Sequence, residues 1–210
     1  MVVQAQDLTG GASPGAGLTG FVVAGGQSRR MGRDKALLPW NGTTLLDHAL
    51  ARLRVACASV RILSGAERRY EDRGVPVETD AVPHAGPLGG IYTGLLGIGA
   101  GPGLFLGVDL PFVTVALLRR LLELCEGHDA VVPQSPRGPE PLCAVYRSTC
   151  LEPIRRRLAA GDRKATSFWA DVDVVHAGEA DLAGLGPLQD VFRNVNTPAD
   201  YESARGGAGG

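Results

Sequence analysis

The sequence lacks several features that mark common classes of protein. Its 21 basic and 22 acidic residues nearly cancel, to a formal net charge of −1, so no basic surface for nucleic acid or for an anionic membrane is indicated. No apolar run approaches the length that spans a bilayer, and the first 20 residues lack the Lys or Arg and the apolar stretch of a secretory signal. We therefore expect a cytoplasmic protein whose partners include neither nucleic acid nor a membrane.

Cysteine and histidine are also scarce, and neither is arranged as a site. The cysteines at 57, 125, 143 and 150 contain no C-x-x-C pair, which disfavours a zinc knuckle and a disulfide framework. The 4 histidines are isolated from one another, and no G-x-S-x-G serine elbow occurs. We interpret the cysteines as reduced thiols and the histidines as structural.

The length and composition favour one globular domain. With 210 residues and 44% hydrophobic composition, the chain can bury a sizeable core. Residues 1–17 and 203–210 are rich in Gly and Ala, so they are predicted to be a disordered extension and a disordered tail around a domain at 18–202.

Short β-branched runs alternate with helical patterns, which predicts βαβ units and a mostly parallel sheet covered on both faces. The expected strands are 19–24, 59–63, 75–78, 104–108, 129–133, 142–146 and 172–176. The strand at 142–146 is expected near an edge, because Pro139 and Pro141 precede it.

Two helices are expected to pack on this sheet. The first covers 44–56, where Thr44 and Asp47 resemble a capping box. The second covers 114–126 and begins with Thr114 as its N-cap. Because ligands gather at the carboxyl ends of parallel strands, the loops after 24, 63, 78 and 108 are expected to meet in one crevice.

The most informative segment is Gly25–Lys35, G-G-Q-S-R-R-M-G-R-D-K, which directly follows an apolar strand-like run. Glycines such as Gly26 let the backbone approach an anion, successive N–H groups favour negative charge, and Arg30 and Lys35 add cations beside Ser28. Neither the dinucleotide pattern nor the Walker pattern fits, so the segment indicates a different loop for a triphosphate. The alternative for Lys35 is an ordinary surface lysine.

Asp109 follows the apolar run 104–108 and precedes Leu110 and Pro111, which places one carboxylate at the tip of a strand. Mg²⁺ prefers one or two carboxylates together with water and phosphate oxygens, so Asp109 is a candidate magnesium ligand facing the glycine-rich loop. The alternative is a residue that caps the helix near Thr114 or stabilises a turn.

Three further segments carry candidate binding residues. Asp80 opens a loop rich in Gly and Pro that reaches Gly86, where contact with a base or ribose competes with the interpretation as a plain connector. Asn194 and Asn196 lie on one side of an extended segment, where they could contact substrate or simply precede the helix cap at 197–198. Arg163 could meet an anionic acceptor or belong to a solvated face.

Taken together, these segments resemble the molybdenum cofactor guanylyltransferases, which are MobA-like nucleotidyltransferases. The matching residues are Val23–Gly26, Ser28, Arg30–Gly32, Asp34–Lys35, Asp80, Gly86–Leu88, Asp109 with Pro111, Pro141–Leu142 and Asn194–Pro198. The resemblance covers about residues 18–202 and implies a three-layer α/β/α Rossmann-like nucleotidyltransferase fold.

The resemblance also implies an activity. The protein would transfer GMP from GTP to the terminal phosphate of molybdopterin and release pyrophosphate, with Mg²⁺ as cofactor and with a molybdopterin-synthesis protein or a molybdoenzyme chaperone as a further partner. The implied catalytic residues are Lys35, Asp109 and Arg30, and Asp109 would hold the metal. The implied nucleotide-binding residues are Val23, Ala24, Gly25, Gly26, Ser28, Lys35, Asp80, Gly86 and Asp109, and those for the acceptor are Asn194, Asn196 and Arg163.

The chain departs from the family at Ser64, where some relatives offer an asparagine, and at Cys143, where many carry a histidine. Glycine at position 25 is the variant associated with guanine, whereas the related cytidylyltransferases have alanine there. The alternatives are a CTP-dependent molybdopterin cytidylyltransferase, a sugar-phosphate nucleotidyltransferase, or a GTP-binding module that delivers the cofactor without catalysis.

Overall fold

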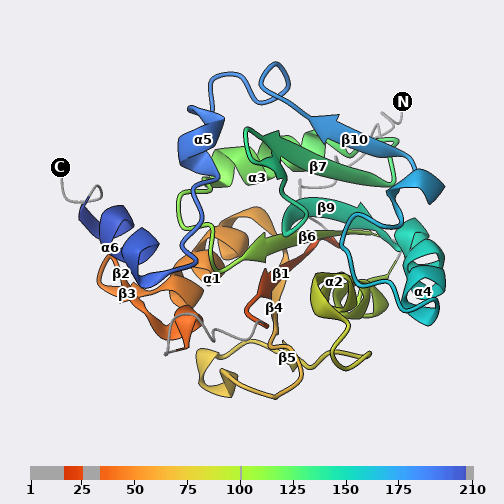
Figure 1. The fold of residues 1–210 in the computed structure, drawn as a ribbon, viewed down its shortest axis with the longest axis horizontal. Coiled ribbons are helices and arrows are strands. Elements are labelled where there is room, and N and C mark those ends of the chain that lie inside the picture. Colours follow the sequence, from red (N-terminus) through yellow and green to blue (C-terminus); the bar gives the residue numbers. More distant parts are fainter. Residues whose placement is uncertain (1–16, 26–33, 100, 207–210) are drawn as a thin grey trace, which may run out of the picture.

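The computed structural model describes residues 17–25, 34–99 and 101–206. Within these ranges, eight strands form one sheet, in the order β10-β7-β9-β6-β1-β4-β5, and β8 pairs with β7 (Figure 1). The strands are β1 (Thr19–Val23), β4 (Ser59–Leu63), β5 (Val77–Glu78), β6 (Pro102–Gly107), β7 (Ala130–Ser135), β8 (Gly138–Pro139), β9 (Cys143–Arg147) and β10 (Val174–Ala177). A separate hairpin consists of β2 (Pro39–Trp40) and β3 (Thr43–Thr44).

Most of the central sheet is parallel, as predicted. Strand β1 pairs in parallel with β4 and β6, β4 pairs in parallel with β5, and β10 pairs in parallel with β7. Strand β9 runs antiparallel to both β6 and β7. The three-layer α/β/α prediction is confirmed, and the strands lie where the β-branched runs placed them with small shifts at their ends.

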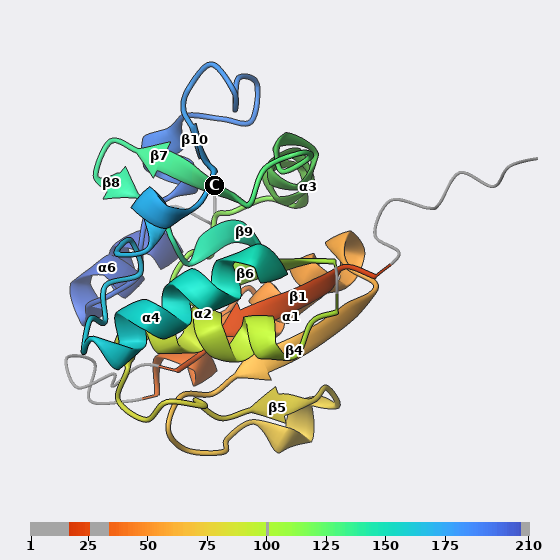
Figure 2. The ribbon, with the colours of Figure 1, turned by 90° about the vertical axis from the view of Figure 1, so that its right-hand side faces the viewer.

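Helices cover both faces of the sheet. One face packs against α1 (Leu45–Ala56) and α3 (Val115–Leu124), and the other packs against α2 (Gly86–Leu96) and α4 (Leu151–Ala159). Figure 2 shows α2 and α4 side by side on one face. Consecutive residues of β1 alternate between the two layers, since Val22 belongs to one buried cluster while Phe21 and Val23 belong to the other.

The two predicted helices begin as their caps indicate. The side chains of Thr44 and Asp47 form the expected capping box at the start of α1, with Asp47 N donating to Thr44 Oγ1 at 3.2 Å. Thr114 accepts from Leu117 N at 3.2 Å at the start of α3. Thr114 therefore caps this helix itself, which leaves Asp109 available for another role.

The prediction that the strand at 142–146 lies near an edge is wrong, because β9 lies inside the sheet between β6 and β7. Pro139 lies in the short outer strand β8 and Pro141 precedes β9, so neither proline removes a donor from the inner strand. Proline next to a strand therefore did not indicate an edge in this chain.

The C-terminal segment packs against the β2–β3 hairpin and the start of α1 through a third buried cluster. Short α5 (Leu188–Val191) and α6 (Pro198–Gly206) follow β10. The cluster joins Leu38, Trp40, Leu45, Val195, Tyr201 and Ala204. Because Ala204 is buried and α6 continues to residue 206, the prediction of a tail beginning at 203 is wrong for residues 203–206, whereas 207–210 lie outside the described residues.

No helix in the described ranges is both long and apolar enough to cross a bilayer. The cytoplasmic location predicted from the sequence remains a prediction.

One glycine of α2 allows the helix to approach the sheet. A Cβ at Gly94 would lie 2.7 Å from Cε1 of Phe105, whose ring stacks on Phe21 and meets Tyr146 edge-on. We expect Gly94→Ala to lower the free energy of unfolding. Overpacking against Phe105 destabilises the fold by about 1–3 kcal/mol, whereas the better helix propensity of alanine stabilises it by only about 1 kcal/mol. Urea denaturation of both proteins measures the difference in free energy of unfolding.

The matched control is Gly90→Ala in the same helix, where a Cβ meets no atom within 4 Å. This variant should gain about 0.5–1 kcal/mol through helix propensity alone. Equal effects of the two substitutions would contradict the packing explanation.

Candidate functional site

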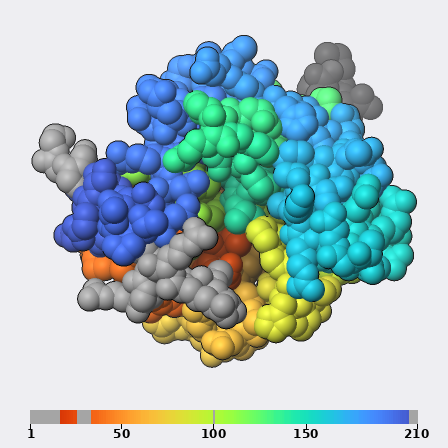
Figure 3. Space-filling view, viewed as in Figure 1, coloured from red at the N-terminus to blue at the C-terminus, as the bar shows by residue number. Residues whose placement is uncertain are grey.

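A cleft opens where β1 and β6 end. It has a volume of about 130 Å³ and is lined by Val23, Ala24, Gly25, Lys35, Ala36, Val108, Asp109 and Leu142. Figure 3 shows this face of the molecule hollowed near its centre, where red atoms of the first strand are visible between the green, blue and yellow segments. The loops after β1 and β6 therefore meet at the carboxyl ends of neighbouring parallel strands, as the sequence predicted for this pair.

The loop after β1 forms one wall of the cleft by close backbone contact. Ala24 N and Gly25 N both donate to Leu63 O at 2.9 Å, beyond the last residue of β1. A Cβ at Gly25 would lie 2.5 Å from Gly65 N and 2.6 Å from Gly65 Cα. Position 25 therefore needs glycine for packing against the loop after β4, whatever ligand the cleft holds.

Asp109 faces the cleft from the end of β6. Its carboxylate lies over Gly107, where a Cβ would come within 2.5 Å of Asp109 Oδ1. Val108 N donates to Val23 O at 3.2 Å, which continues the pairing of the two strands into their loops. The apolar run and the glycine thus place this carboxylate beside the loop after β1.

Lys35 faces Asp109 across the cleft. It opens a 3₁₀ turn, η1 (Lys35–Leu37), and its Nζ lies 3.5 Å from Asp109 Oδ2 and donates to Asn196 Oδ1 at 3.0 Å. The Lys35 and Asp109 side chains are 17% and 25% exposed, so both are mostly shielded yet reachable from the cleft. The Lys35 side chain is thus mostly buried and paired, unlike an ordinary surface lysine, and its role in binding stays a prediction.

Asn196 reaches this pair because the C-terminal segment is fixed in two ways. Val195 N donates to Asp109 O at 2.9 Å, and Val195 is buried in the third cluster. The Asp200 carboxylate accepts from Asn196 N at 3.0 Å and Thr197 N at 2.8 Å. These hydrogen bonds, led by the one from Asn196 N, lower the pKa of Asp200, so this helix cap stays ionised.

Four other predicted site residues do not line this cleft. Gly86 has φ +63° and faces the backbone of Arg163, since a Cβ at position 86 would lie 3.6 Å from Arg163 O. Asp80 donates from its N to Gly65 O, and burial raises the pKa of its carboxyl while the nearby His84 opposes that effect. Asn194 directly precedes the buried Val195 and is not among the lining residues.

The remaining predicted residues, Gly26, Ser28 and Arg30, fall in the segment 26–33, outside the described residues. Their roles stay predictions.

The two departures from the family pattern have structural roles. Ser64 is fully buried, and its hydroxyl donates to Glu67 O at 2.8 Å, so it is not directed into the cleft. Cys143 is also fully buried in β9, where burial, followed by the charges of Glu140 and Asp109, raises the pKa of the thiol. Cys143 is therefore an apolar neighbour of the site and not a nucleophile.

Sequence reasoning gave no binding role to three cleft residues, Ala36, Val108 and Leu142, because apolar side chains carry no chemical signature, although Leu142 belongs to one of the matching motifs. It also missed Gly65, whose φ of +81° and contact with Gly25 appear only in the fold. The position of Val108 directly before Asp109 could have indicated that Val108 lies at the cleft.

The cleft suits a hard divalent cation that arrives with a nucleotide. The described residues hold no group of three or more His, Cys, Asp and Glu side chains placed for a metal, which disfavours an all-protein cage in this part of the chain. Asp109 supplies one carboxylate, and the amide oxygen of Asn196 contacts the same Lys35 ammonium. That oxygen set fits Mg²⁺, which usually keeps water and phosphate oxygens as its other ligands.

Comparison with known proteins supplies the family. The family model described as the MobA-like NTP transferase domain matches residues 20–177. This chain belongs to that family. The matched range includes all of β1 except Thr19, as well as Lys35 and the tip of β6, so the residues that line the cleft lie within the shared domain.

The curated relatives agree over most of the chain. A probable molybdenum cofactor guanylyltransferase of Pelotomaculum thermopropionicum is 36% identical, over 89% of this chain and 91% of the relative. The molybdenum cofactor guanylyltransferase of Desulfosudis oleivorans is 32% identical, over 89% of this chain and 94% of the relative.

Solved structures agree on the fold. Molybdopterin-guanine dinucleotide biosynthesis protein A from Archaeoglobus fulgidus superposes with a TM-score of 0.73 at 24% identity, covering 90% of this chain and 98% of that one. The 2-C-methyl-D-erythritol 4-phosphate cytidylyltransferase of Thermus thermophilus gives 0.66 at 17% identity, covering 90% and 97%.

The contact between Gly25 and Gly65 generates a prediction. We expect Gly25→Ala to lower the free energy of unfolding by about 1–3 kcal/mol, because the added methyl meets backbone atoms that cannot rotate away. Chemical denaturation measures this loss. Gly178→Ala is the control, since a Cβ there meets nothing within 4 Å, and a Gly25→Ala protein as stable as this control would show that the contact is not close.

Proposed function

We propose that this protein transfers GMP from GTP to molybdopterin, forming the molybdopterin guanine dinucleotide cofactor and pyrophosphate. The observation that carries the proposal is the cleft in which the Lys35 ammonium lies between the Asp109 carboxylate and the Asn196 amide. The relatives that match most of the chain are named for guanylyl transfer to the molybdenum cofactor. In an open parallel sheet, ligands bind beyond the carboxyl ends of the strands, which is where Lys35 lies. A bound triphosphate carries several negative charges, and a cation such as Lys35 stabilises them.

The reaction is a displacement at the α-phosphorus of GTP. An oxygen of the terminal molybdopterin phosphate attacks, the bond from the α-phosphorus to its bridging oxygen breaks, and pyrophosphate leaves with that oxygen. The attacking phosphate is already ionised at neutral pH, so the protein needs no strong general base. Stabilising charge is then the main task of the side chains.

Two side chains do most of that work. Lys35 donates to phosphate oxygens and offsets the negative charge that gathers on them. Asp109 is the residue that would hold Mg²⁺, which would supply further positive charge to the triphosphate when bound. A structural neighbour from Mycobacterium tuberculosis is described as a complex with manganese, which supports a divalent metal here.

The nucleoside lies along the wall made by Val23, Ala24 and Gly25. Asp80 and Gly86 lie outside the cleft lining, and we propose that they contact the nucleoside from there, with the Asp80 carboxylate accepting a hydrogen bond when it is ionised. Gly26, Ser28 and Arg30 lie outside the described residues, and we propose from the sequence that they bind the phosphates, with Arg30 as a second cation.

The acceptor approaches from the C-terminal side. Asn194 and Asn196 offer amide groups there, and Arg163 offers a cation next to Gly86. Molybdopterin-synthesis proteins or a molybdoenzyme chaperone are the partners we propose for supplying the acceptor or receiving the product in the cytoplasm.

The decisive experiment uses GTP labelled at the α-phosphate, Mg²⁺ and molybdate-loaded molybdopterin with the full-length protein. Label should enter a dinucleotide with release of pyrophosphate. Asp109→Asn should keep the fold and lower turnover by on the order of 10³-fold, because it removes the charge that would hold the metal. Glu71→Gln, an exposed carboxylate in a surface ion pair, is the control and should leave turnover unchanged.

The same assay distinguishes the alternatives. A preference for CTP, ATP or UTP over GTP would replace guanylyl transfer by another nucleotidyl transfer. Bound GTP without labelled product in the presence of acceptor would favour a delivery module. Near-normal turnover of Asp109→Asn at saturating Mg²⁺ would contradict the role of this carboxylate.

A further inference from the structure

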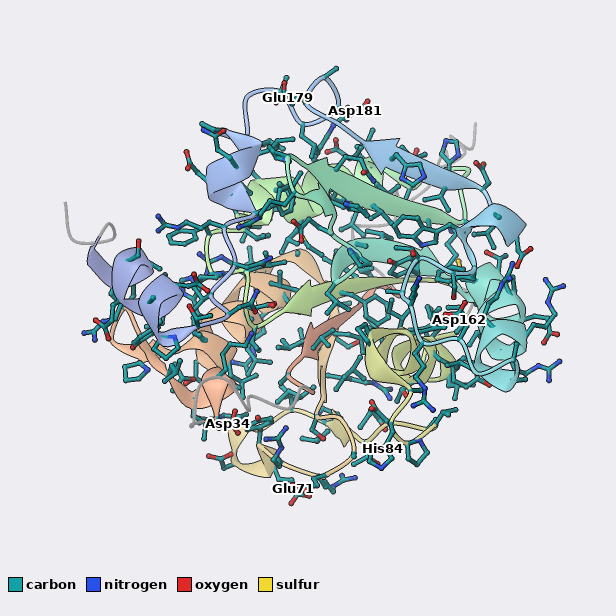
Figure 4. All side chains as sticks on the ribbon, viewed as in Figure 1. Asp34, Glu71, His84, Asp162, Glu179 and Asp181 are labelled. Carbon is teal, nitrogen blue, oxygen red and sulfur yellow. The ribbon has the colours of Figure 1, made fainter. Side chains whose placement is uncertain are left out.

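Asp34, the residue before Lys35, forms a polar cluster with Arg69 and Tyr70. None of the three side chains is among the residues that line the cleft. Asp34 accepts hydrogen bonds from Tyr70 OH, at 2.8 Å to Oδ2, and from Arg69 Nη1 at 3.1 Å. Arg69 and Tyr70 belong to the connection between β4 and β5, and Figure 4 shows Asp34 next to that connection. One carboxylate thus joins the residue before Lys35 to a distant part of the chain.

The same carboxylate also caps the turn that presents Lys35. Asp34 is the N-cap of η1, and its Oδ1 accepts from Ala36 N at 3.1 Å. Leu38 N then donates to Lys35 O at 3.1 Å and closes the turn. Because Lys35 lies inside this turn, the direction in which its side chain leaves the backbone depends on the position of Asp34.

Arg69 and Tyr70 are themselves tightly placed. Arg69 Nη2 donates to Ser64 O at 3.3 Å, and its guanidinium lies 5.1 Å from the centroid of the Tyr70 ring. Tyr70 is buried with φ +71°, a left-handed conformation that a residue with a side chain adopts only when its surroundings fix it. Burial, and then the hydrogen bond to Asp34, raise the pKa of Tyr70, so its hydroxyl stays a donor.

We propose that Arg69 and Tyr70 are positioning residues that act through Asp34 to hold Lys35 ready for a triphosphate. The inference rests on the proposed function, because it assigns a task to the same lysine. Neither side chain lines the described cleft, so both act on the nucleotide without touching it.

The test is a double-mutant cycle read by calorimetric titration of the full-length protein with GTP and Mg²⁺. Tyr70→Phe removes the donor and keeps the ring, and it should weaken GTP binding by about three- to tenfold. Lys35→Ala should weaken binding more, by about 10-fold or above. If Tyr70 acts through Lys35, Tyr70→Phe should cause little further loss in the Lys35→Ala protein.

Arginine variants provide a second and independent arm. Arg69→Ala should also weaken GTP binding, and Arg69→Lys should restore part of it, since an ammonium keeps the charge but cannot bond Asp34 and Ser64 as a planar fork does. The matched control is Arg68→Ala, which removes the preceding arginine and its exposed ion pair with Glu71. This control should bind GTP as the wild type does.

The outcomes are separable. Wild-type affinity in both Tyr70→Phe and Arg69→Ala, or additive losses in the cycle, would overturn the positioning role. GTP binding without labelled dinucleotide in the transfer assay would contradict the proposed function, while the cycle would still decide the inference. A wild-type protein with no affinity for GTP would overturn both.

Discussion

One ammonium group joins three distant parts of the chain, and the site depends on it. Lys35 Nζ bonds the amide of Asn196 and lies 3.5 Å from the carboxylate of Asp109, so the loop after β1, the tip of β6 and the C-terminal segment meet at one charge. Backbone pairing holds both partners of Lys35 in position. The parallel register of β1 and β6 brings Asp109 into place, and the bond from Val195 N to Asp109 O brings Asn196.

Several residues near Lys35 have roles in packing that do not depend on a bound ligand. Glycine is required at 107 to make room for the Asp109 carboxylate and at 25 to pack on Gly65. Asp34, adjacent to the lysine, is directed away from the cleft toward Arg69 and Tyr70. Neighbouring polar residues in one motif therefore have different tasks, since Lys35 faces the cleft and Asp34 stabilises the turn behind it.

Much of this arrangement could be predicted from local patterns. Short β-branched and apolar runs located β1, β4 and β6, and the Thr44–Asp47 pair located the start of α1. Prediction was wrong where position in the sheet or long-range packing decides: β9 lies inside the sheet despite its preceding prolines, and Ala204 is buried by contacts with residues around Trp40. Arg69 and Tyr70 escaped detection because their role depends on a contact with Asp34, 35 and 36 residues away.

The most direct test of the account is a crystal structure of the complex with GTP and Mn²⁺, in which Mn²⁺ is located by its anomalous scattering. We expect an anomalous peak within about 2.0–2.3 Å of an Asp109 carboxylate oxygen and of phosphate oxygens, with the triphosphate bonded to Lys35 Nζ. A nucleotide bound elsewhere, or a metal remote from Asp109, would contradict it.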